Sequence, residues 1–397
     1  MSAHAGHVVV VGAGPVGLVT ALGLARRGVK VTVLEREAAV MASPRAMVYH
    51  CAVLPGLERL GLLEDVLEAG FTATRLGMHV FATGEKIGLD VGVLEGHEPY
   101  AYNVHLGQHE LARIALEHLR ELPGTEVLFG TSVLGLTEDA DGVTVQASRS
   151  YEPLEIRADY VVGADGARSQ VRKLIGLELE GMTWPERFVA TNIRYDMKKL
   201  GYEDANMVID DTFGCVVARI DEEGLWRVTF AEDADLPEEE LPDRIATFFK
   251  TFLKGDDEYR IREYSPYFMH QRSAPTYRKG RVLLAGDAAH ITNPTGGMGL
   301  TSGLFDSFVL SEALAAVVDG TVGDEVLDAY SEQRRKVFLE YASPTAVRFK
   351  TLVYNPTPEI LAEALVGLRM AAADENVGRR AMALAQPVET PSLVAAV

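Results

Sequence analysis

Close to its start the chain carries the stretch Val8-Val9-Val10-Val11-Gly12-Ala13-Gly14-Pro15-Val16-Gly17. Four consecutive valines are typical of a buried strand, and the residues from Leu18 to Arg27 have helical spacing that ends at Gly28. A strand, a glycine-rich turn and a helix in this order form a dinucleotide-binding unit, whose helix N-terminus receives the pyrophosphate. We therefore expect a cofactor to lie against five residues of the turn: Gly12, Gly14, Pro15, Val16 and Gly17.

An acidic residue closes the next predicted strand. Val29 to Leu34 has the composition of a strand, and Glu35 follows it directly. A carboxylate about 20 residues after the glycines binds a ribose hydroxyl and would repel the extra phosphate of NADP. We expect Glu35, with its neighbour Arg36, to belong to the cofactor site.

Composition and charge exclude several classes of partner. The chain has 397 residues, with 38 basic and 57 acidic side chains and a formal charge of −19, which opposes binding to nucleic acid and anionic membranes. Its two cysteines, Cys51 and Cys215, lie far apart and lack metal-ligand spacing, so we expect a reducing compartment and no metal site. Val8 to Ala25 is apolar, but it contains four glycines and a proline and no basic segment precedes it. The sequence thus predicts a cytoplasmic protein.

Two later segments combine an acidic residue with small residues at a strand end. Ala164-Asp165-Gly166 is one, and Gly286-Asp287 within Ala285 to His290 is the other, where a carboxylate can reach a polyol. Pro294 to Gly299 then brings bare backbone to the start of a long predicted helix, Met298 to Val318. The N-H groups and dipole of that helix would stabilise the negative charge of a reduced flavin. We expect the following residues to line the cofactor: Asp165, Gly286, Asp287, Pro294, Gly297, Met298, Gly299 and Leu300.

With these motifs the chain resembles the single-component, class A FAD-dependent aromatic hydroxylases of the 4-hydroxybenzoate hydroxylase type. The resemblance extends over nearly the whole length and includes Arg45-Ala46, which opens a predicted helix through Val53, and the segment from Leu106 to Glu110. It implies that Arg45 and Gln108 contact FAD. It also implies that FAD is held non-covalently and that NADH or NADPH is the co-substrate.

The order of the predicted strands and helices along the chain indicates an α/β fold, which agrees with the resemblance. A Rossmann-like FAD-binding domain of the glutathione-reductase type is interrupted by a β-sheet substrate domain and followed by a helical C-terminal segment whose last dozen residues are poorly ordered. The expected ranges are 1–75, 101–180 and 271–345 for the discontinuous FAD-binding domain, 76–100 and 181–270 for the β-rich substrate domain, and 346–397 for the helical segment with a flexible tail.

The activity implied by the resemblance is that of a monooxygenase. Such an enzyme hydroxylates a small phenolic or hydroxy-heteroaromatic compound with NAD(P)H and O2, through a flavin hydroperoxide. The carbonyl of Pro294 would lie beside the substrate hydroxyl, with Thr295 next to it. Arg219 is the candidate for a substrate carboxylate, although it stands one place out from the matching position on the strand Cys215 to Ile220, and one place is the opposite face.

A base or proton relay should lie within reach of the substrate hydroxyl. His270 and Tyr267 are the main candidates, and Tyr102 and His79 are two others. The sequence leaves two alternatives open, namely a reductase or dehydrogenase of the same fold that does not use O2, and a non-catalytic FAD-binding protein. It also leaves open the aromatic substrate, the ring position, the choice between NADH and NADPH, and whether the chain forms a homodimer.

Overall fold

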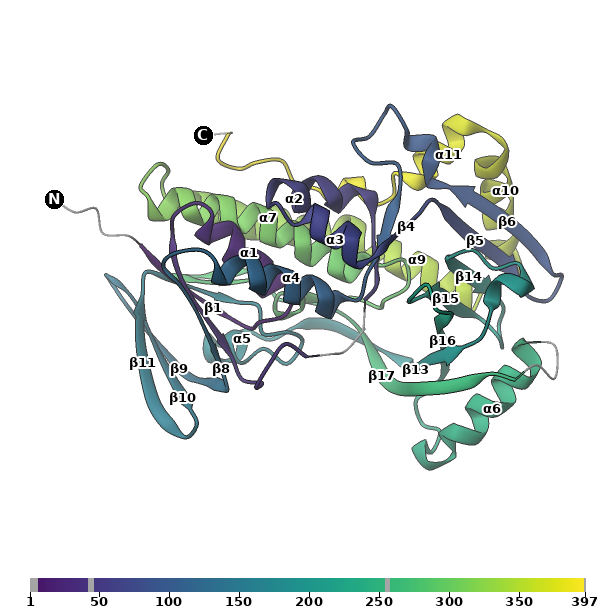
Figure 1. Ribbon diagram of the computed structural model, residues 1–397, viewed down its shortest axis with the longest axis horizontal. Coiled ribbons are helices and arrows are strands. Elements are labelled where there is room, and N and C mark those ends of the chain that lie inside the picture. The colour runs from purple at the N-terminus through teal and green to yellow at the C-terminus, as the bar shows by residue number, and fades with distance from the viewer. Residues whose placement is uncertain (1–5, 42–45, 254–257, 396–397) are drawn as a thin grey trace.

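The computed structural model describes residues 6–41, 46–253 and 258–395. Two large β-sheets organise the molecule, one toward each end of its long axis (Figure 1). The first has six strands in the order β18-β19-β12-β1-β2-β8, and β1 pairs in parallel with β2 and β12. The strands of this sheet are His7–Val11 (β1), Lys30–Glu35 (β2), Thr125–Phe129 (β8), Tyr160–Gly163 (β12), Arg278–Lys279 (β18) and Val282–Leu284 (β19).

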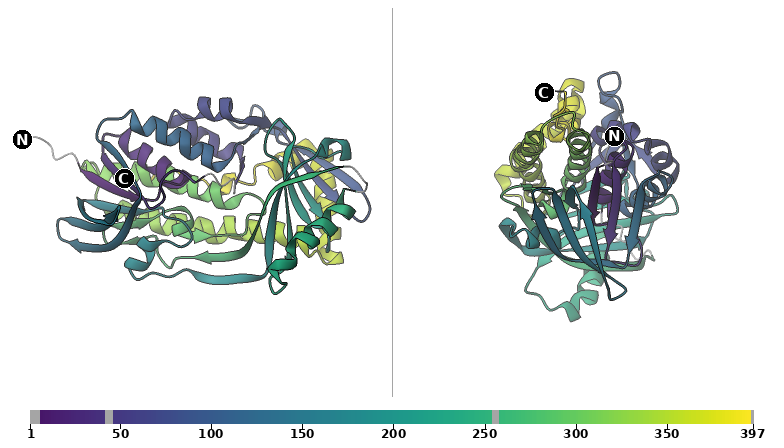
Figure 2. Two further views of the ribbon diagram at one scale, coloured as in Figure 1. Left: turned by 60° about the horizontal axis from the view of Figure 1, so that its bottom comes forward. Right: turned by 90° about the vertical axis from the view of Figure 1, so that its left-hand side faces the viewer.

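Helices cover one face of the six-stranded sheet and a three-stranded antiparallel sheet covers the other (Figure 2). This double cover explains why Val8, Val9 and Val10 are fully buried. The antiparallel strands are Thr131–Asp139 (β9), Gly142–Arg149 (β10) and Glu152–Ala158 (β11). The helices of this half are Pro15–Ala25 (α1), Leu54–Arg59 (α2), Leu63–Ala69 (α3), Gln108–Arg120 (α4), Gln170–Leu174 (α5), Met298–Val318 (α7) and Glu325–Val337 (α8).

The long helix α7 has the bounds that the sequence predicts. It packs against α1 so closely that a β-carbon on Gly23 would lie 2.4 Å from the Oγ atom of Ser311. By length and composition α7 could cross a membrane, but 78% of its most apolar window is buried inside the protein. It is therefore a core helix of this fold.

The second sheet has eight strands in the order β20-β17-β13-β16-β15-β14-β5-β6. On one face Val217 packs toward Ile245 and other side chains of α6, and on the opposite face Phe188 packs toward Leu352 of α9. The strands are Arg75–Val80 (β5), Glu85–Asp90 (β6), Glu180–Arg194 (β13), Ala205–Ile209 (β14), Cys215–Arg219 (β15), Leu225–Asp233 (β16), Arg260–Ser273 (β17) and His290–Ile291 (β20). The helices are Leu241–Phe252 (α6), Ser343–Tyr354 (α9), Pro358–Ala373 (α10) and Glu375–Met382 (α11).

One predicted element differs from the structure. The predicted helix from Arg45 to Val53 is a short strand, Val48–Tyr49 (β3), followed by a single turn that starts at Cys51. The strand forms because it pairs with Asn103–His105 (β7), which also pairs with Phe71–Ala73 (β4). Pairing over more than 50 residues of chain overrides the local helical pattern.

The C-terminal segment also departs from expectation. After α11 the chain returns to the nucleotide-binding half, where Val388, Thr390 and Leu393 are buried (Figure 1). Val388 and Leu393 belong to the same hydrophobic core as β1. The expected flexible tail is therefore not found as far as Leu393, because apolar side chains hold it against this core.

Candidate cofactor and substrate site

The glycine-rich turn has the geometry that a pyrophosphate requires. Gly12 has φ +109° and lies against the carbonyl oxygen of Ala164, which would be 2.4 Å from a β-carbon, while a β-carbon on Gly17 would be 2.0 Å from the Gly12 oxygen. A β-carbon on Gly14 would meet no described atom within 4 Å. Gly12 and Gly17 thus serve packing, whereas Gly14 leaves room for a ligand. Within the described chain no side chain caps the start of α1, so its N-H groups are available to an anion.

Glu35 closes β2 beside this turn. Its Oε2 atom accepts a hydrogen bond from the backbone N-H of Ala13 at 2.7 Å, and Oε1 accepts one from Glu37 at 2.9 Å. A carboxylate has about four acceptor positions, so those left over can bind ribose hydroxyls. Arg36 is directed at Glu37, 3.3 Å away, and is mostly exposed. Arg45 lies outside the described residues.

Asp165 and Gln108 are two further residues that we expect at the cofactor site. The carboxylate of Asp165 accepts hydrogen bonds from Ser169 Oγ, Gln170 N and Val171 N at 2.5, 2.6 and 3.1 Å, so it organises the start of α5. Gln108 is the first residue of α4, and its backbone N-H donates to the Ala46 carbonyl at 3.0 Å. The structure thus brings Gln108 next to Ala46.

The Gly286-Asp287 turn is locked to α1 and α7. Gly286 has φ +60°, and a β-carbon on it would lie 3.0 Å from Val16 Cγ2. The same Cγ2 atom would lie 2.7 Å from a β-carbon on Gly303 of α7. Asp287 follows the turn with an exposed side chain. Val16 therefore fixes the glycine turn, the acidic turn and α7 relative to one another.

The segment before α7 presents backbone and little side chain. Gly296 and Gly297 have φ +84° and +70°, and the Gly297 N-H donates to the carbonyl of Pro294 at 3.1 Å. Gln271 holds the segment from β17, because its Oε1 accepts from both Asn293 N and Asn293 Nδ2 at 3.2 Å. In the part of the chain that the structure describes, no side chain caps α7 at Gly297. Met298, Gly299 and Leu300 thus begin a helix whose N-H groups are open to a negative flavin edge.

The sequence analysis missed His50. Its Nε2 atom lies 2.9 Å from the carbonyl oxygen of Gly296 and would lie 3.0 Å from a β-carbon on Gly297. Burial lowers the pKa of His50, although the bond to Gly296 opposes this shift. His50 lies in the segment from Arg45 to Val53, whose sequence pattern is helical, and this pattern does not indicate a contact with the loop before α7.

One side of this loop is aromatic. Thr295 is fully buried, and its hydroxyl lies beside the phenol of Tyr354 on α9. The ring of Tyr354 packs on Phe188 of β13 at 4.7 Å, and a β-carbon on Gly296 would lie 2.8 Å from Phe349. Burial raises the pKa of Tyr354 well above its usual value. This wall suits a small ring.

The two main candidates for the base lie on opposite faces of β17. Tyr267 is on the face of Gln271, which holds the loop before α7, and its ring meets Phe188 edge-on at 6.0 Å. His270 is on the other face, and its Nδ1 atom lies 2.9 Å from Thr183 Oγ1. Burial, and then Arg272, lower the pKa of His270. The structure brings Tyr267, but not His270, to the side of the loop.

The other two candidates have neighbours of their own. His79 stacks on Tyr202 at 4.5 Å and lies 3.1 Å from Asn206 Oδ1, and burial lowers its pKa to about 4. Tyr102 contacts Tyr100 edge-on at 5.7 Å.

Arg219 is held by groups of the protein. Its Nε and Nη2 donate to the carbonyls of Asp221 and Glu222 at 2.9 and 3.1 Å, and Nη1 lies 3.3 Å from Asp204 Oδ1. On β15 it shares a face with Val217, which packs toward α6. This is the face opposite the aromatic wall.

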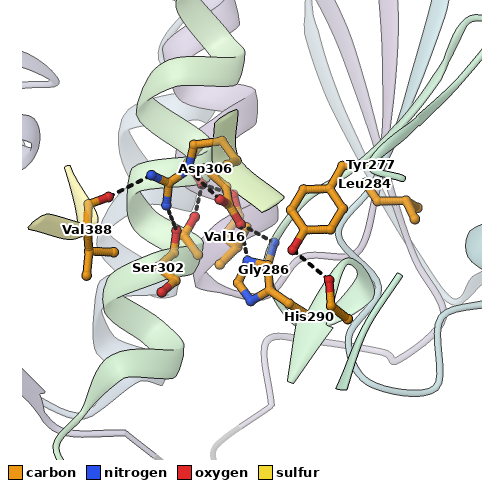
Figure 3. Close-up of polar contacts among 12 residues, drawn as sticks. Val16, Tyr277, Leu284, Gly286, His290, Ser302, Asp306 and Val388 are labelled. Atoms are coloured by element: carbon orange, nitrogen blue, oxygen red, sulfur yellow. Dashed lines mark hydrogen bonds and ion pairs between the residues drawn. The ribbon is translucent and has the colours of Figure 1, made fainter. Parts of the chain in front are cut away.

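A buried cluster next to the Gly286-Asp287 turn was also missed (Figure 3). Asp306 of α7 accepts hydrogen bonds from Gly286 N and His290 Nε2 and pairs with Arg334. The signal in the sequence is a carboxylate near the middle of a long apolar helix. Among residues 6–41, 46–253 and 258–395, no group of three or more His, Cys, Asp or Glu side chains could hold a metal ion.

Comparisons with known proteins identify the family of this chain. Residues 6–342 match the family model described as FAD binding domain. The chain is 45% identical to para-nitrophenol 4-monooxygenase from a Pseudomonas species, covering 88% of each chain. It is 44% identical to 6-hydroxy-3-succinoylpyridine 3-monooxygenase from Pseudomonas putida, covering 89% of this chain and 90% of the relative.

A solved structure shares the whole architecture. The crystal structure of p-nitrophenol 4-monooxygenase from Pseudomonas putida superposes with a TM-score of 0.93 at 41% identity, covering 97% of this chain and 98% of that one. Likeness at this level extends through both sheets and the C-terminal helices. It favours a monooxygenase over the reductase and the non-catalytic binding protein. The chain therefore belongs to the FAD binding domain family and is an FAD-dependent monooxygenase of the aromatic hydroxylase group.

Proposed function

We propose that the protein hydroxylates a small phenolic or hydroxy-heteroaromatic compound, with NADH or NADPH and O2 as co-substrates and FAD held non-covalently. The observation that carries this proposal is the contact between His50 and Gly296, which places a titratable ring at the flavin loop beside an aromatic wall. FAD, when bound, supplies the reduction of O2 and the transfer of one oxygen atom.

His50 is the group we assign to the substrate proton. The Nε2-H donates to the Gly296 carbonyl, which fixes the ring and leaves Nδ1 as its acceptor. A lowered pKa keeps that acceptor unprotonated near neutral pH. Removal of the hydroxyl proton by Nδ1, directly or through water, makes the aromatic ring more nucleophilic. Tyr267 is the second candidate, because it lies on the loop side of β17.

The protein positions the two reactants. The open N-terminus of α7 stabilises negative charge on the flavin edge, and Gly14 leaves space for the pyrophosphate. The Pro294 carbonyl and the Thr295 hydroxyl are the groups that we assign to the substrate hydroxyl. The aromatic wall of Phe188 and Phe349 excludes water from the reacting ring.

The substrate that fits best is uncharged apart from its hydroxyl. Arg219, the candidate for a carboxylate, is already bound to Asp204 and to two carbonyls on the far face of β15. A benzoate carboxylate would therefore lack this partner. A nitro or acyl group needs no counter-charge and suits an aromatic wall.

The names of two relatives suggest the ring position. Position 4 of para-nitrophenol and position 3 of 6-hydroxy-3-succinoylpyridine both carry a substituent and both lie para to the hydroxyl. A deprotonated hydroxyl delivers electron density to the para carbon. We propose that this protein likewise forms a C–O bond at the substituted carbon para to a hydroxyl group. The bond from that carbon to its substituent breaks, so that a nitro group leaves as nitrite and the ring becomes a quinone. A second NAD(P)H supplies the two electrons that reduce the quinone to the dihydroxy product.

A substrate panel tests the proposal. NAD(P)H oxidation, O2 uptake and product mass are measured with 4-nitrophenol, 4-hydroxybenzoate and 6-hydroxypyridines that carry a 3-acyl group. We expect kcat/KM for an uncharged para-substituted substrate to exceed that for 4-hydroxybenzoate by at least about tenfold, equivalent to about 1.4 kcal/mol. A preference for 4-hydroxybenzoate would contradict the assignment of substrate class.

A further inference from the structure

Three donors converge on one buried carboxylate next to the Gly286-Asp287 turn (Figure 3). Asp306 on α7 and Arg334 on α8 are both fully buried, and His290 is 1% exposed. The Oδ2 atom of Asp306 accepts from Gly286 N at 3.0 Å and from His290 Nε2 at 2.6 Å, and Oδ1 accepts from Arg334 Nε at 2.8 Å.

The site requires an ionised carboxylate. Burial raises the pKa of Asp306, but His290 and Arg334 outweigh this effect and lower it to about 2. An amide in its place would offer one acceptor oxygen to three donors, and would leave the guanidinium of Arg334 without a counter-charge. Apolar side chains in place of both Asp306 and Arg334 would be cheaper to bury, so we infer that this ion pair serves position and not burial.

The carboxylate sets the direction of the turn. Gly286 adopts φ +60°, and its N-H is aimed at Asp306. The orientation of this peptide determines where Asp287, the next residue, directs its side chain. Asp306 therefore acts on the cofactor through Gly286, without being expected to touch the cofactor itself.

Arg334 connects the cluster to the C-terminal strap, which we define as residues 386–393. Its Nη1 donates to the Val388 carbonyl at 2.6 Å and to Thr390 Oγ1 at 2.8 Å, while Nη2 donates to the Ser302 carbonyl at 3.1 Å. Ser302 belongs to the first turns of α7. One guanidinium thus joins the strap, the start of α7 and Asp306.

We propose that Asp306 and Arg334 position the Gly286-Asp287 turn and the start of α7 for FAD, and that the C-terminal strap completes this arrangement by holding Arg334. Within the strap, Val388 and Thr390 then act on the cofactor site through Arg334. Weakening its hold on Arg334 loosens FAD before it unfolds the protein.

Thr390→Val tests the strap, because it removes the hydroxyl acceptor and keeps the shape. Thr390→Ser is the conservative variant that retains the acceptor. FAD affinity of the full-length apoprotein is measured by flavin fluorescence quenching, beside the Tm of the apoprotein. We expect Thr390→Val to raise the Kd for FAD about three- to tenfold, and Thr390→Ser to stay within twofold of the parent protein.

Two matched controls separate positioning from general stability. Ser392 lies in the same strap, and Ser392→Ala removes its hydrogen bond to Glu312 Oε1 of α7. Arg335 is the residue next to Arg334, and Arg335→Met removes its hydrogen bond to the Ala274 carbonyl. Neither residue contacts Asp306, so we expect the Kd for FAD to stay within twofold in both. Asp306→Asn is expected to raise it about 10- to 100-fold.

The proposal is overturned if Thr390→Val leaves FAD affinity within twofold of the parent protein. It is equally overturned if either control weakens FAD as much as Thr390→Val for the same loss of apoprotein Tm, because the cluster would then act through overall stability. If Asp306→Asn fails to fold, the Thr390 pair still decides, since Thr390 lies at the edge of the cluster.

Discussion

The Nε2 atom of His50 lies 2.9 Å from the carbonyl oxygen of Gly296, although 246 positions separate the two residues in the chain. The contact joins the turn after β3 to the loop before α7. It brings a histidine with a lowered pKa to the place where the resemblance puts the flavin ring and the substrate hydroxyl. The account of catalysis depends on this contact.

Replacing His50 by glutamine is expected to lower kcat/KM about 100-fold for a weakly acidic phenol, the size of effect typical for loss of a positioned base. The loss should shrink for 4-nitrophenol, which is already largely ionised in mildly alkaline buffer and needs no base. Steady-state kinetics with both substrates measure the difference. His270→Gln and His79→Gln are the controls. A large loss of kcat/KM in His270→Gln with no loss in His50→Gln would show that His270, and not His50, is the base.

The pH profile follows from the direction of the His50 shift. Its pKa in the folded protein lies below the ordinary value of 6.5, so the base is available above 6.5 and is lost as pH falls through the lower folded value. The folding stability contributed by neutral His50 has the same sign and disappears in the same acid range. We expect the acid limb of kcat/KM to have its midpoint below 6.5 and to be absent in His50→Gln. A limb that persists unchanged in the variant would exclude His50.

Gly14 and Gly17 should respond to alanine in opposite ways. Gly14 has φ −76° and open space at its β-carbon, so Gly14→Ala should fold normally but raise the Kd for FAD at least about tenfold. In Gly17→Ala the new methyl group would lie 2.0 Å from the Gly12 oxygen, and overpacking should cost about 1–3 kcal/mol or more of apoprotein stability. Apoprotein Tm and FAD titration distinguish the two. Normal FAD affinity in Gly14→Ala would show that the pyrophosphate lies elsewhere.

Arg219→Met should change stability and leave substrate binding alone. The variant loses the ion pair with Asp204 and two hydrogen bonds to carbonyls, so its Tm should fall. The KM of the best substrate should remain within about twofold, a difference worth less than 0.5 kcal/mol. A KM that rises tenfold or more at unchanged Tm would show that Arg219 binds the substrate.

The sequence predicts the parts of this protein that local chemistry decides. The turn from Gly12 to Gly17 and the bounds of α7 could be predicted, because valine runs, glycine spacing and helical periodicity are read within a few residues. Strand alternation in the sequence indicated that Arg219 lies on the face opposite the position expected to bind a carboxylate. The structure places its side chain on the α6 face.

The position of His50 and the packing of the C-terminal strap could not be predicted, because both depend on contacts between residues far apart in the sequence. His50 lies after a strand that exists only because Val48 and Tyr49 pair with β7. The C-terminal strap lies against the core through Val388 and Leu393, and its Val388 and Thr390 bind Arg334 across more than 50 residues of chain. Neither pairing leaves a local pattern that a single sequence can display.

Oxygen labelling tests the central claim most directly. The purified protein with FAD is supplied with NADH or NADPH and a para-substituted phenol under 18O2, and the product is examined by mass spectrometry beside the yield of peroxide. We expect one 18O atom in the aromatic product, at the carbon para to the original hydroxyl. Oxidation of NADH and NADPH that yields only hydrogen peroxide, with no labelled product from any phenol or hydroxypyridine tried, would contradict it.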